Sequence, residues 1–275
     1  MAQTLTIECL RPGNGAYFVS NRYDARRAEG FPGAGPADTE SAALGNWLLV
    51  QAPTTPCLEL TLTGGRWCLS GTGQFALAGA EMEATLDGRP CPINEVHPVD
   101  NESLLLELKA ARVGMRTYLT ARGDWSATVV QPNQALRPGW TATVRSNRTT
   151  SHQSEPIRSD RFQTASLLAY PGPEWELLSE GIRRWLLTDD FRLIEGNRQG
   201  LRFQTSRTPA LNLPPLLSSP VLPGTVQLTP AGPVILGPAA HTVGGYPRAL
   251  VLDDIYLGVA YQRPFGTYLD FRLAE

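Results

Sequence analysis

The sequence has little lysine and little charge overall. Of its 24 basic residues only Lys109 is a lysine, and charged residues make up 18% of the 275 residues, against roughly a quarter in an average globular protein. The formal net charge is −2 and the pI is about 6.0, so we expect no binding to nucleic acid or to anionic membranes. The arginines are scattered, which favours a compositional bias over a dedicated phosphate or carboxylate site.

Long apolar runs, metal motifs and paired cysteines are also lacking. No apolar stretch approaches the roughly 18 residues of a membrane span, and the residues that follow Met1 show no signal-peptide pattern. The four cysteines form no CxxC motif, and no histidine stands at zinc-ligand spacing. We therefore expect a cytoplasmic protein with reduced thiols and no metal site.

Turn-forming residues, in contrast, are abundant. The chain contains 26 glycines and 23 prolines, which interrupt helices and favour turns. Between them lie short apolar stretches, and those at 5–9 and 58–62 alternate with polar residues, as half-buried strands do. Asp87-Gly88 predicts a two-residue hairpin turn. The pattern predicts a mainly β protein of the barrel or sandwich class.

Two segments predict short helices among these strands. Asp38 can cap a helix that continues to Leu49. From Pro173 to Leu186, apolar residues recur every three or four positions, which is the spacing of one helical face. Four later segments read as strands: 225–228, 233–236, 252–261 and 265–273.

A polar stretch without any pattern, 147–161, indicates a connection. It would separate an amino-terminal β part, 1–146, from a carboxy-terminal β part, 162–275. We expect the two parts to pack as one unit.

No general catalytic motif is present, because the sequence contains neither a GxSxG elbow nor a P-loop. The densest group of chemically useful residues runs from His241 to Arg248. Gly244 and Gly245 would let a ligand approach the backbone, Tyr246 offers a phenol, and an arginine can bind carboxylate or phosphate. A structural bend between two strands explains the same residues, and composition alone favours that bend.

Fragments along nearly the whole chain resemble a known family. They occur at 35–38, 45–48, 58–65, 77–88, 116–123, 168–173, 224–228 and 244–248. Their order and spacing are similar to those of the C-type subunit of 5-oxoprolinase, the KipA-type family that is also called allophanate hydrolase subunit 2. The same family forms the second half of the carboxyltransferase domain in biotin-dependent urea carboxylase. Its most specific signature matches Gly244-Gly245-Tyr246-Pro247-Arg248.

The resemblance implies a cyclophilin-like β-barrel architecture with two short helices. It implies a C-type component of an ATP-dependent 5-oxoprolinase that acts with a KipI-like partner (the B-type subunit) and allows a LamB-type partner (the A-type subunit). It implies no cofactor bound by this chain alone, with ATP used in the complex. The candidate cleft would contain Asp38, His241, Thr242, Gly244, Gly245, Tyr246, Pro247 and Arg248.

Three polar elements of that family are altered here. Its Asp-x-Gln-Thr-Thr run reads Ala239-Ala240-His241-Thr242-Val243, so that the acid is replaced by Ala239 and the amide by His241. Its Gln-Asp pair is matched only loosely at 18–23, and its Gly-Ser-Arg-Ser-Thr loop after Gly123 is shortened or absent. If such groups stabilise a transition state, losing one donor costs roughly 10²–10³ in rate.

Three functions therefore remain open. The chain can be the hydrolase component, or a divergent enzyme that acts on another substrate with a site rebuilt from Asp24, Asp38, His241 and Tyr246. It can be a non-catalytic KipA-type paralogue that keeps the partner surface. It can also serve biotin-linked carboxyl transfer, with biotin on another polypeptide, because Lys109 does not stand in a Met-Lys attachment motif.

Overall fold

The computed structural model describes residues 3–20, 25–128, 131, 133–146, 159–210 and 216–274. The chain divides into two compact units, Met1–Asn21 with Thr39–Ser159 and Arg22–Asp38 with Asp160–Glu275. Residues 22–38 thus belong to the second unit, although the sequence prediction grouped them with 1–146. Long-range contacts explain this assignment: for example, Nη2 of Arg198 donates to the carbonyl oxygen of Gly35 at 2.6 Å, a pairing that no local pattern encodes.

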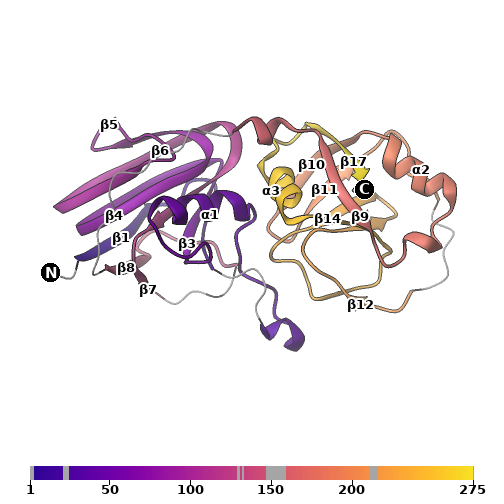
Figure 1. Cartoon of the computed structure of the whole chain (residues 1–275), viewed down its shortest axis with the longest axis horizontal. Helices are drawn as coiled ribbons and strands as arrows, with labels where there is room; N and C mark the ends of the chain where they lie inside the picture. The colour runs from indigo at the N-terminus through magenta and orange to yellow at the C-terminus, as the bar shows by residue number, and fades with distance from the viewer. Residues whose placement is uncertain are drawn as a thin grey trace. The chain divides into compact units, whose positions relative to one another are not determined.

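The first unit is an eight-stranded antiparallel sheet in the order β2-β3-β6-β4-β1-β8-β7, with β5 paired to β4. Its two longest strands, β4 and β6, pair with each other along their length (Figure 1). The strand bounds are Gln3–Arg11 (β1), Ala16–Val19 (β2), Cys57–Thr61 (β3), Thr63–Leu86 (β4), Arg89–Pro90 (β5), Val96–Ala121 (β6), Asp124–Ala127 (β7) and Thr141–Ser146 (β8).

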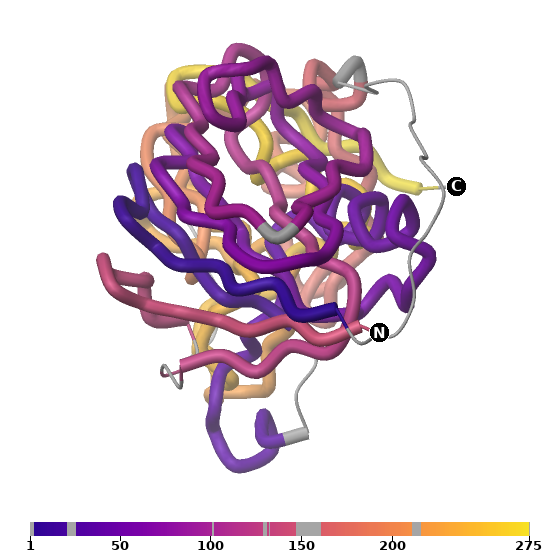
Figure 2. Tube along the Cα trace, turned by 90° about the vertical axis from the view of Figure 1, so that its left-hand side faces the viewer, coloured from indigo at the N-terminus to yellow at the C-terminus, as the bar shows by residue number. Residues whose placement is uncertain are grey.

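The alternation of buried and exposed side chains along the strands shows which face of this sheet forms the core. In β1 the side chains of Leu5, Ile7 and Cys9 are buried while those between them are partly exposed, as the period of two requires. β1 and β8 run side by side (Figure 2), in an antiparallel pairing. The predicted hairpin is confirmed: Asp87 and Gly88, between β4 and β5, have φ angles of 47° and 75°, which a type I′ turn needs at both positions.

The second unit is a closed seven-stranded barrel in the order β10-β11-β14-β13-β16-β9-β17. Its interior holds an aromatic cluster in which Phe271 lies 5.3 Å from Phe191 and 6.5 Å from Phe203 between ring centroids. The predicted mainly β barrel architecture is confirmed. The strands are Ser166–Pro171 (β9), Phe191–Asn197 (β10), Gly200–Gln204 (β11), Thr225–Thr229 (β13), Gly232–Leu236 (β14), Arg248–Leu252 (β16) and Tyr268–Leu273 (β17).

Three α-helices accompany the sheets in the described part of the chain, instead of the two predicted. They are α1 (Thr39–Leu48), α2 (Glu180–Thr188) and α3 (Asp254–Gln262), and 3-10 turns lie at Ala25–Glu29 (η1), Ser159–Gln163 (η2) and Trp175–Leu177 (η3). The first predicted helix is confirmed by α1. The second begins at Glu180 rather than near Pro173, after the separate η3 turn. None of the helices described is long and apolar enough to cross a membrane.

The predicted strand at 252–261 is wrong, because most of it forms α3. From Leu257 to Gln262 every residue of this helix is buried, so it shows no one-sided apolar pattern, and a short apolar run of this kind is ambiguous between helix and strand. Its start is set by Asp253, whose Oδ1 accepts a hydrogen bond from the backbone N of Ile255 at 2.9 Å.

Removing this cap tests the assignment of α3. We expect Asp253→Ala to lower the free energy of unfolding by about 1 kcal/mol, because a helix N–H loses its acceptor. Asp253→Asn keeps the accepting oxygen and is expected to retain most of the stability. Urea denaturation measures both, and equal losses in the two variants would contradict a capping role.

Candidate functional site

Residues 241–248, which we call the signature turn, lie next to the barrel in the second unit. Within the turn, β15 (Val243–Gly244) pairs with β12 (Ser219–Pro220) as a separate two-stranded ribbon. The backbone N of Val221 donates to the carbonyl oxygen of Thr242 at 3.0 Å and extends this pairing. The turn therefore has a defined backbone on its entry side, and it leads directly into barrel strand β16.

Arg248 fixes the exit of the turn through a forked ion pair with Glu174. Its Nε and Nη2 donate to Oε2 and Oε1 of Glu174 at 2.8 and 2.5 Å, its backbone N donates to Oε2 at 2.9 Å, and its Nη1 donates to the carbonyl oxygen of Pro220 at 2.7 Å. The two side chains are 17% and 14% exposed. Hydrogen bonds from the Arg248 side chain lower the pKa of Glu174, and the same bonds raise the pKa of Arg248.

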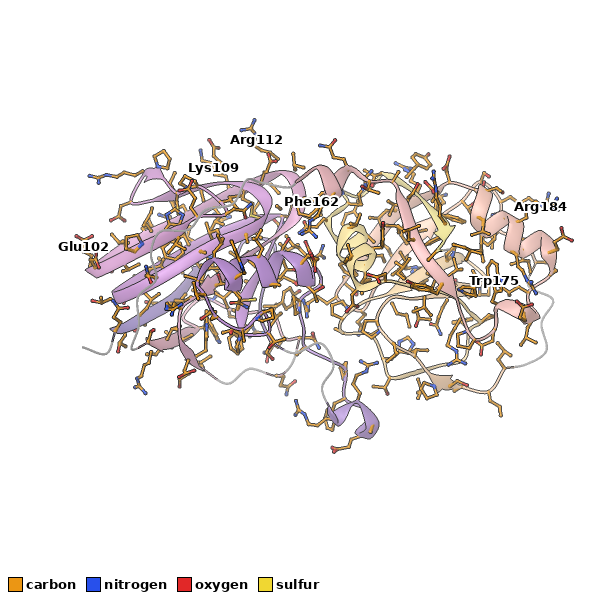
Figure 3. All side chains as sticks on the ribbon, in the orientation of Figure 1. Glu102, Lys109, Arg112, Phe162, Trp175 and Arg184 are labelled. Atoms are coloured by element: carbon orange, nitrogen blue, oxygen red, sulfur yellow. The ribbon has the colours of Figure 1, made fainter. Side chains whose placement is uncertain are left out.

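The fork thus joins the turn to the segment before η3, whose Trp175 is labelled in Figure 3. Because the guanidinium is already occupied by a carboxylate and a carbonyl, it serves to position the turn. The sequence analysis suggested that Arg248 binds a ligand anion. It did not identify Glu174, because a partner 74 positions away leaves no local signal.

The backbone at Gly244 is packed closely against two polar side chains. A Cβ atom there would lie 2.6 Å from Nε2 of Gln227 and 3.1 Å from Nε2 of His241, so only glycine fits at this position without a shift of its neighbours. Gln227 is 2% exposed, and its Nε2 donates to the carbonyl oxygen of Tyr246 at 3.4 Å. In the sequence, Gln227 had stood out only within the fragment 224–228.

The remaining residues of the turn are placed as follows. Tyr246 is 50% exposed, so its phenol faces solvent. Pro247 is buried, and its carbonyl oxygen accepts a hydrogen bond from the backbone N of Leu228 at 3.0 Å. Thr242 is half-buried and Gly245 is exposed. The turn is therefore anchored at its backbone and open at His241, Gly245 and Tyr246.

Asp38 belongs to a different cluster, in which it is completely buried. Its Oδ2 lies 3.0 Å from Nη2 of Arg161 and accepts a hydrogen bond from Nε2 of Gln262, in α3, at 2.9 Å. A buried charge with such partners holds chain segments together. We therefore interpret Asp38 as the residue that attaches the end of segment 25–38 to α3, and its place in a catalytic cleft stays a prediction.

The altered family elements can be followed only in part. Ala239, which replaces the acid, is 5% exposed, and its backbone N donates to the carbonyl oxygen of Arg198 at 2.9 Å. After Gly123 the chain enters β7 at Asp124 at once, so no long loop follows that glycine directly. The candidate Asp24 lies outside the described residues.

In the described ranges, no group of three or more His, Cys, Asp or Glu residues could hold a metal ion. The four cysteines form no disulfide bond in the structure. Burial raises the pKa of Cys9 to about 11 and that of Cys91 to about 12, so neither thiol is activated as a nucleophile.

Comparison with known proteins places this fold and turn in a family. The family described as carboxyltransferase domain, subdomain A and B, matches residues 29–273. The chain belongs to this carboxyltransferase domain family. The 5-oxoprolinase C subunit of Escherichia coli (strain K12) is 26% identical over 89% of this chain and 84% of its own length.

Two solved structures show the same fold at lower identity. TTHA0988 is 23% identical to this chain, with a TM-score of 0.82. The match covers 97% of this chain and 55% of TTHA0988. The urea carboxylase of Kluyveromyces lactis is 20% identical with a TM-score of 0.80, again over 97% of this chain but only 27% of its own. This chain thus spans about half of the first structure and about a quarter of the second.

The fork at Arg248 makes stability depend on pH. Since the pKa of Glu174 is lowered in the folded state, its charge stabilises the fold above the unfolded value of about 4.3 and loses this effect as the pH falls through the lower folded value. At pH 7 we expect Glu174→Gln to reduce the free energy of unfolding by about 1–3 kcal/mol.

The difference between the parent and Glu174→Gln should shrink on acidification below about pH 4, measured by urea denaturation at several pH values. Glu176→Gln is the matched control, because Glu176 is 80% exposed in its pair with Arg183. Its expected effect is below about 1 kcal/mol. A constant difference between pH 7 and pH 3 would contradict the role of Glu174.

The interpretation of Asp38 predicts a large structural effect. Asp38→Asn should lower the free energy of unfolding by about 3 kcal/mol, because it removes a buried negative charge that lies 3.0 Å from the Arg161 guanidinium. Asp190→Asn, at an exposed aspartate of the same unit, should stay within about 0.5 kcal/mol. Equal urea midpoints for the two variants would show that the Asp38 pair does not hold the segment.

Proposed function

We propose that the chain is a C-type component of an ATP-dependent 5-oxoprolinase, which opens the lactam of 5-oxoproline to glutamate together with a KipI-like, B-type partner. The proposal is supported by the family membership over most of the chain and by the relative named as the C subunit of 5-oxoprolinase. A LamB-type partner, the A-type subunit, would complete the complex. The chain would bind no cofactor by itself, and ATP would be consumed in the assembled complex.

The observation that carries the proposal is the intact support of the signature turn. The backbone at Gly244 is packed against two side-chain nitrogens, from Gln227 and His241, and Arg248 is bound to Glu174. Preorganised donors of this kind can stabilise charge that develops on a carbonyl oxygen. The turn would supply such a face, and the partner subunits would supply the remaining groups.

A second candidate function is favoured by one observation. Ala239 replaces the family acid and is buried against the carbonyl oxygen of Arg198, so this position offers no polar side chain. A non-catalytic KipA-type regulatory paralogue would keep the turn as a binding surface without turnover. Biotin-linked carboxyl transfer rests on fold similarity to urea carboxylase at 20% identity, and no side chain described above favours it.

Reconstitution distinguishes the two candidates. The purified chain is combined with the A-type and B-type proteins, and release of ADP and glutamate from ATP and 5-oxoproline is measured. We expect turnover well above that of the two partner proteins alone. Stable association with the B-type protein without any gain in turnover would reject the hydrolase and support the regulatory paralogue.

Two glycine variants connect the activity to the turn. Gly244→Ala should lower turnover at least about 10-fold, because the added methyl would lie 2.6 Å from Gln227 Nε2 and displace that side chain. Gly245→Ala is the matched control: its methyl would meet only Ser218 Oγ at 3.5 Å, an ordinary contact. Equal activity of the two variants, in a complex that turns over, would place the site elsewhere.

A further inference from the structure

A cleft of about 440 Å³ lies beside the signature turn, between the end of β10, the start of β11, the end of β14 and His241. Its volume falls within the range of small-molecule sites, roughly 300–1,000 Å³. His241 is the residue that connects the two features, because it lines the cleft and a Cβ at Gly244 would lie only 3.1 Å from its Nε2. The cleft therefore borders the turn on which the proposed function depends.

The wall of the cleft at the β10–β11 turn is held in place from within. Oδ1 of Asn197 accepts hydrogen bonds from the backbone N atoms of Gln199 and Gly200 at 2.7 and 3.3 Å. The hydroxyl of Tyr261 donates to the carbonyl oxygen of Asn197 at 2.9 Å. Both oxygens of Asn197 are thus used by the protein, and its Nδ2 is bonded to no described residue.

Two further groups on the cleft are open to a ligand. The side-chain amide of Gln199 and the imidazole of His241 are both exposed, and neither makes a hydrogen bond within the described residues. Together with Nδ2 of Asn197 they surround the cleft with unused hydrogen-bonding groups, most of which can donate. Such groups favour a ligand that is rich in acceptor oxygens.

The charged and apolar residues of the cleft further restrict the class of ligand that it can bind. Glu195, which lines the cleft, is paired with Nη1 of Arg202 at 2.8 Å, so its negative charge is balanced. The remaining N–H groups of Arg202 can still receive an anion. Val234 and Leu236 provide apolar surface beside these groups, suited to the short hydrocarbon part of a small molecule.

We infer that this cleft binds a small carboxylate that also carries an amide carbonyl, with His241 as the contact that selects it. Carboxamide nitrogens match the amide carbonyl, while imidazole and guanidinium match the carboxylate. 5-Oxoproline is a member of this class, and its choice as the probe rests on the proposed function. The binding itself requires no ATP and no partner protein.

Imidazole NMR of the full chain tests the inference, because the sequence contains only three histidines, His97, His152 and His241. We expect 5-oxoproline to cause a saturable shift of one ring signal, and this signal should be the one missing from His241→Gln. That variant should weaken binding at least about 10-fold. His97→Gln is the matched control, since its ring nitrogen is bound to the carbonyl oxygen of Pro92 in the other unit, and it should bind within about twofold of the parent.

Ligand controls test the chemical class. Acetate carries only the carboxylate and 2-pyrrolidone only the lactam, and each should bind at least about 10-fold more weakly than 5-oxoproline. A second variant, Gln199→Ala, removes an exposed side chain, so it should fold, and it should weaken binding severalfold. Equal binding of the three compounds, or no ring shift at tens of millimolar 5-oxoproline, would overturn the inference.

The outcome is separable from that of the proposed function. Saturable binding at His241 in a chain that adds no turnover to its two partner proteins would uphold the site and reject the hydrolase. Turnover in the reconstituted complex that is unchanged by His241→Gln, without any ring shift, would reject the site and uphold the hydrolase.

Discussion

Closure of the seven-stranded barrel is the constraint on which the second unit depends. Inward-facing aromatic rings of Phe191, Phe203 and Phe271 pack together inside it, and every strand is paired on both sides. A closed sheet leaves no edge onto which further chain can be added. The chain between β14 and β16 must therefore leave the barrel, and it forms the ribbon and the signature turn outside it.

Polar contacts with distant segments fix the position of the signature turn. The Glu174 carboxylate reaches both the side chain and the backbone of Arg248, while Gln227 binds the turn from the neighbouring strand β13. Each group would be costly to leave unpaired at its depth of burial. The pairing consequently restricts the turn to one arrangement, and the exposed residues His241, Gly245 and Tyr246 are presented on a rigid base.

Two of the altered positions, Ala239 and His241, have different surroundings in the structure. Ala239 is buried, and its backbone N is bonded to the carbonyl oxygen of Arg198, so this position offers no polar side chain. His241, two positions later, lines the cleft. The exposed part of the segment thus combines Gly245 and Tyr246, which match the signature of the resembling family, with His241, which does not.

Local sequence patterns were enough to predict the mainly β class, the hairpin at Asp87-Gly88 and helix α1, because turn chemistry and the alternation of apolar residues act over a few neighbouring positions. They also pointed to residues 241–248 as the most distinctive segment. Helix α3 was misread, since its buried stretch from Leu257 to Gln262 is mostly apolar, as a buried strand of the same length would be. Three further findings required the folded structure. Arg248 is bound to Glu174, Asp38 is buried with Arg161 and Gln262, and His241 shares a cleft with the β10–β11 turn. The first two depend on partners 74 to 224 positions apart, and no local pattern can record which distant groups a closed barrel brings together.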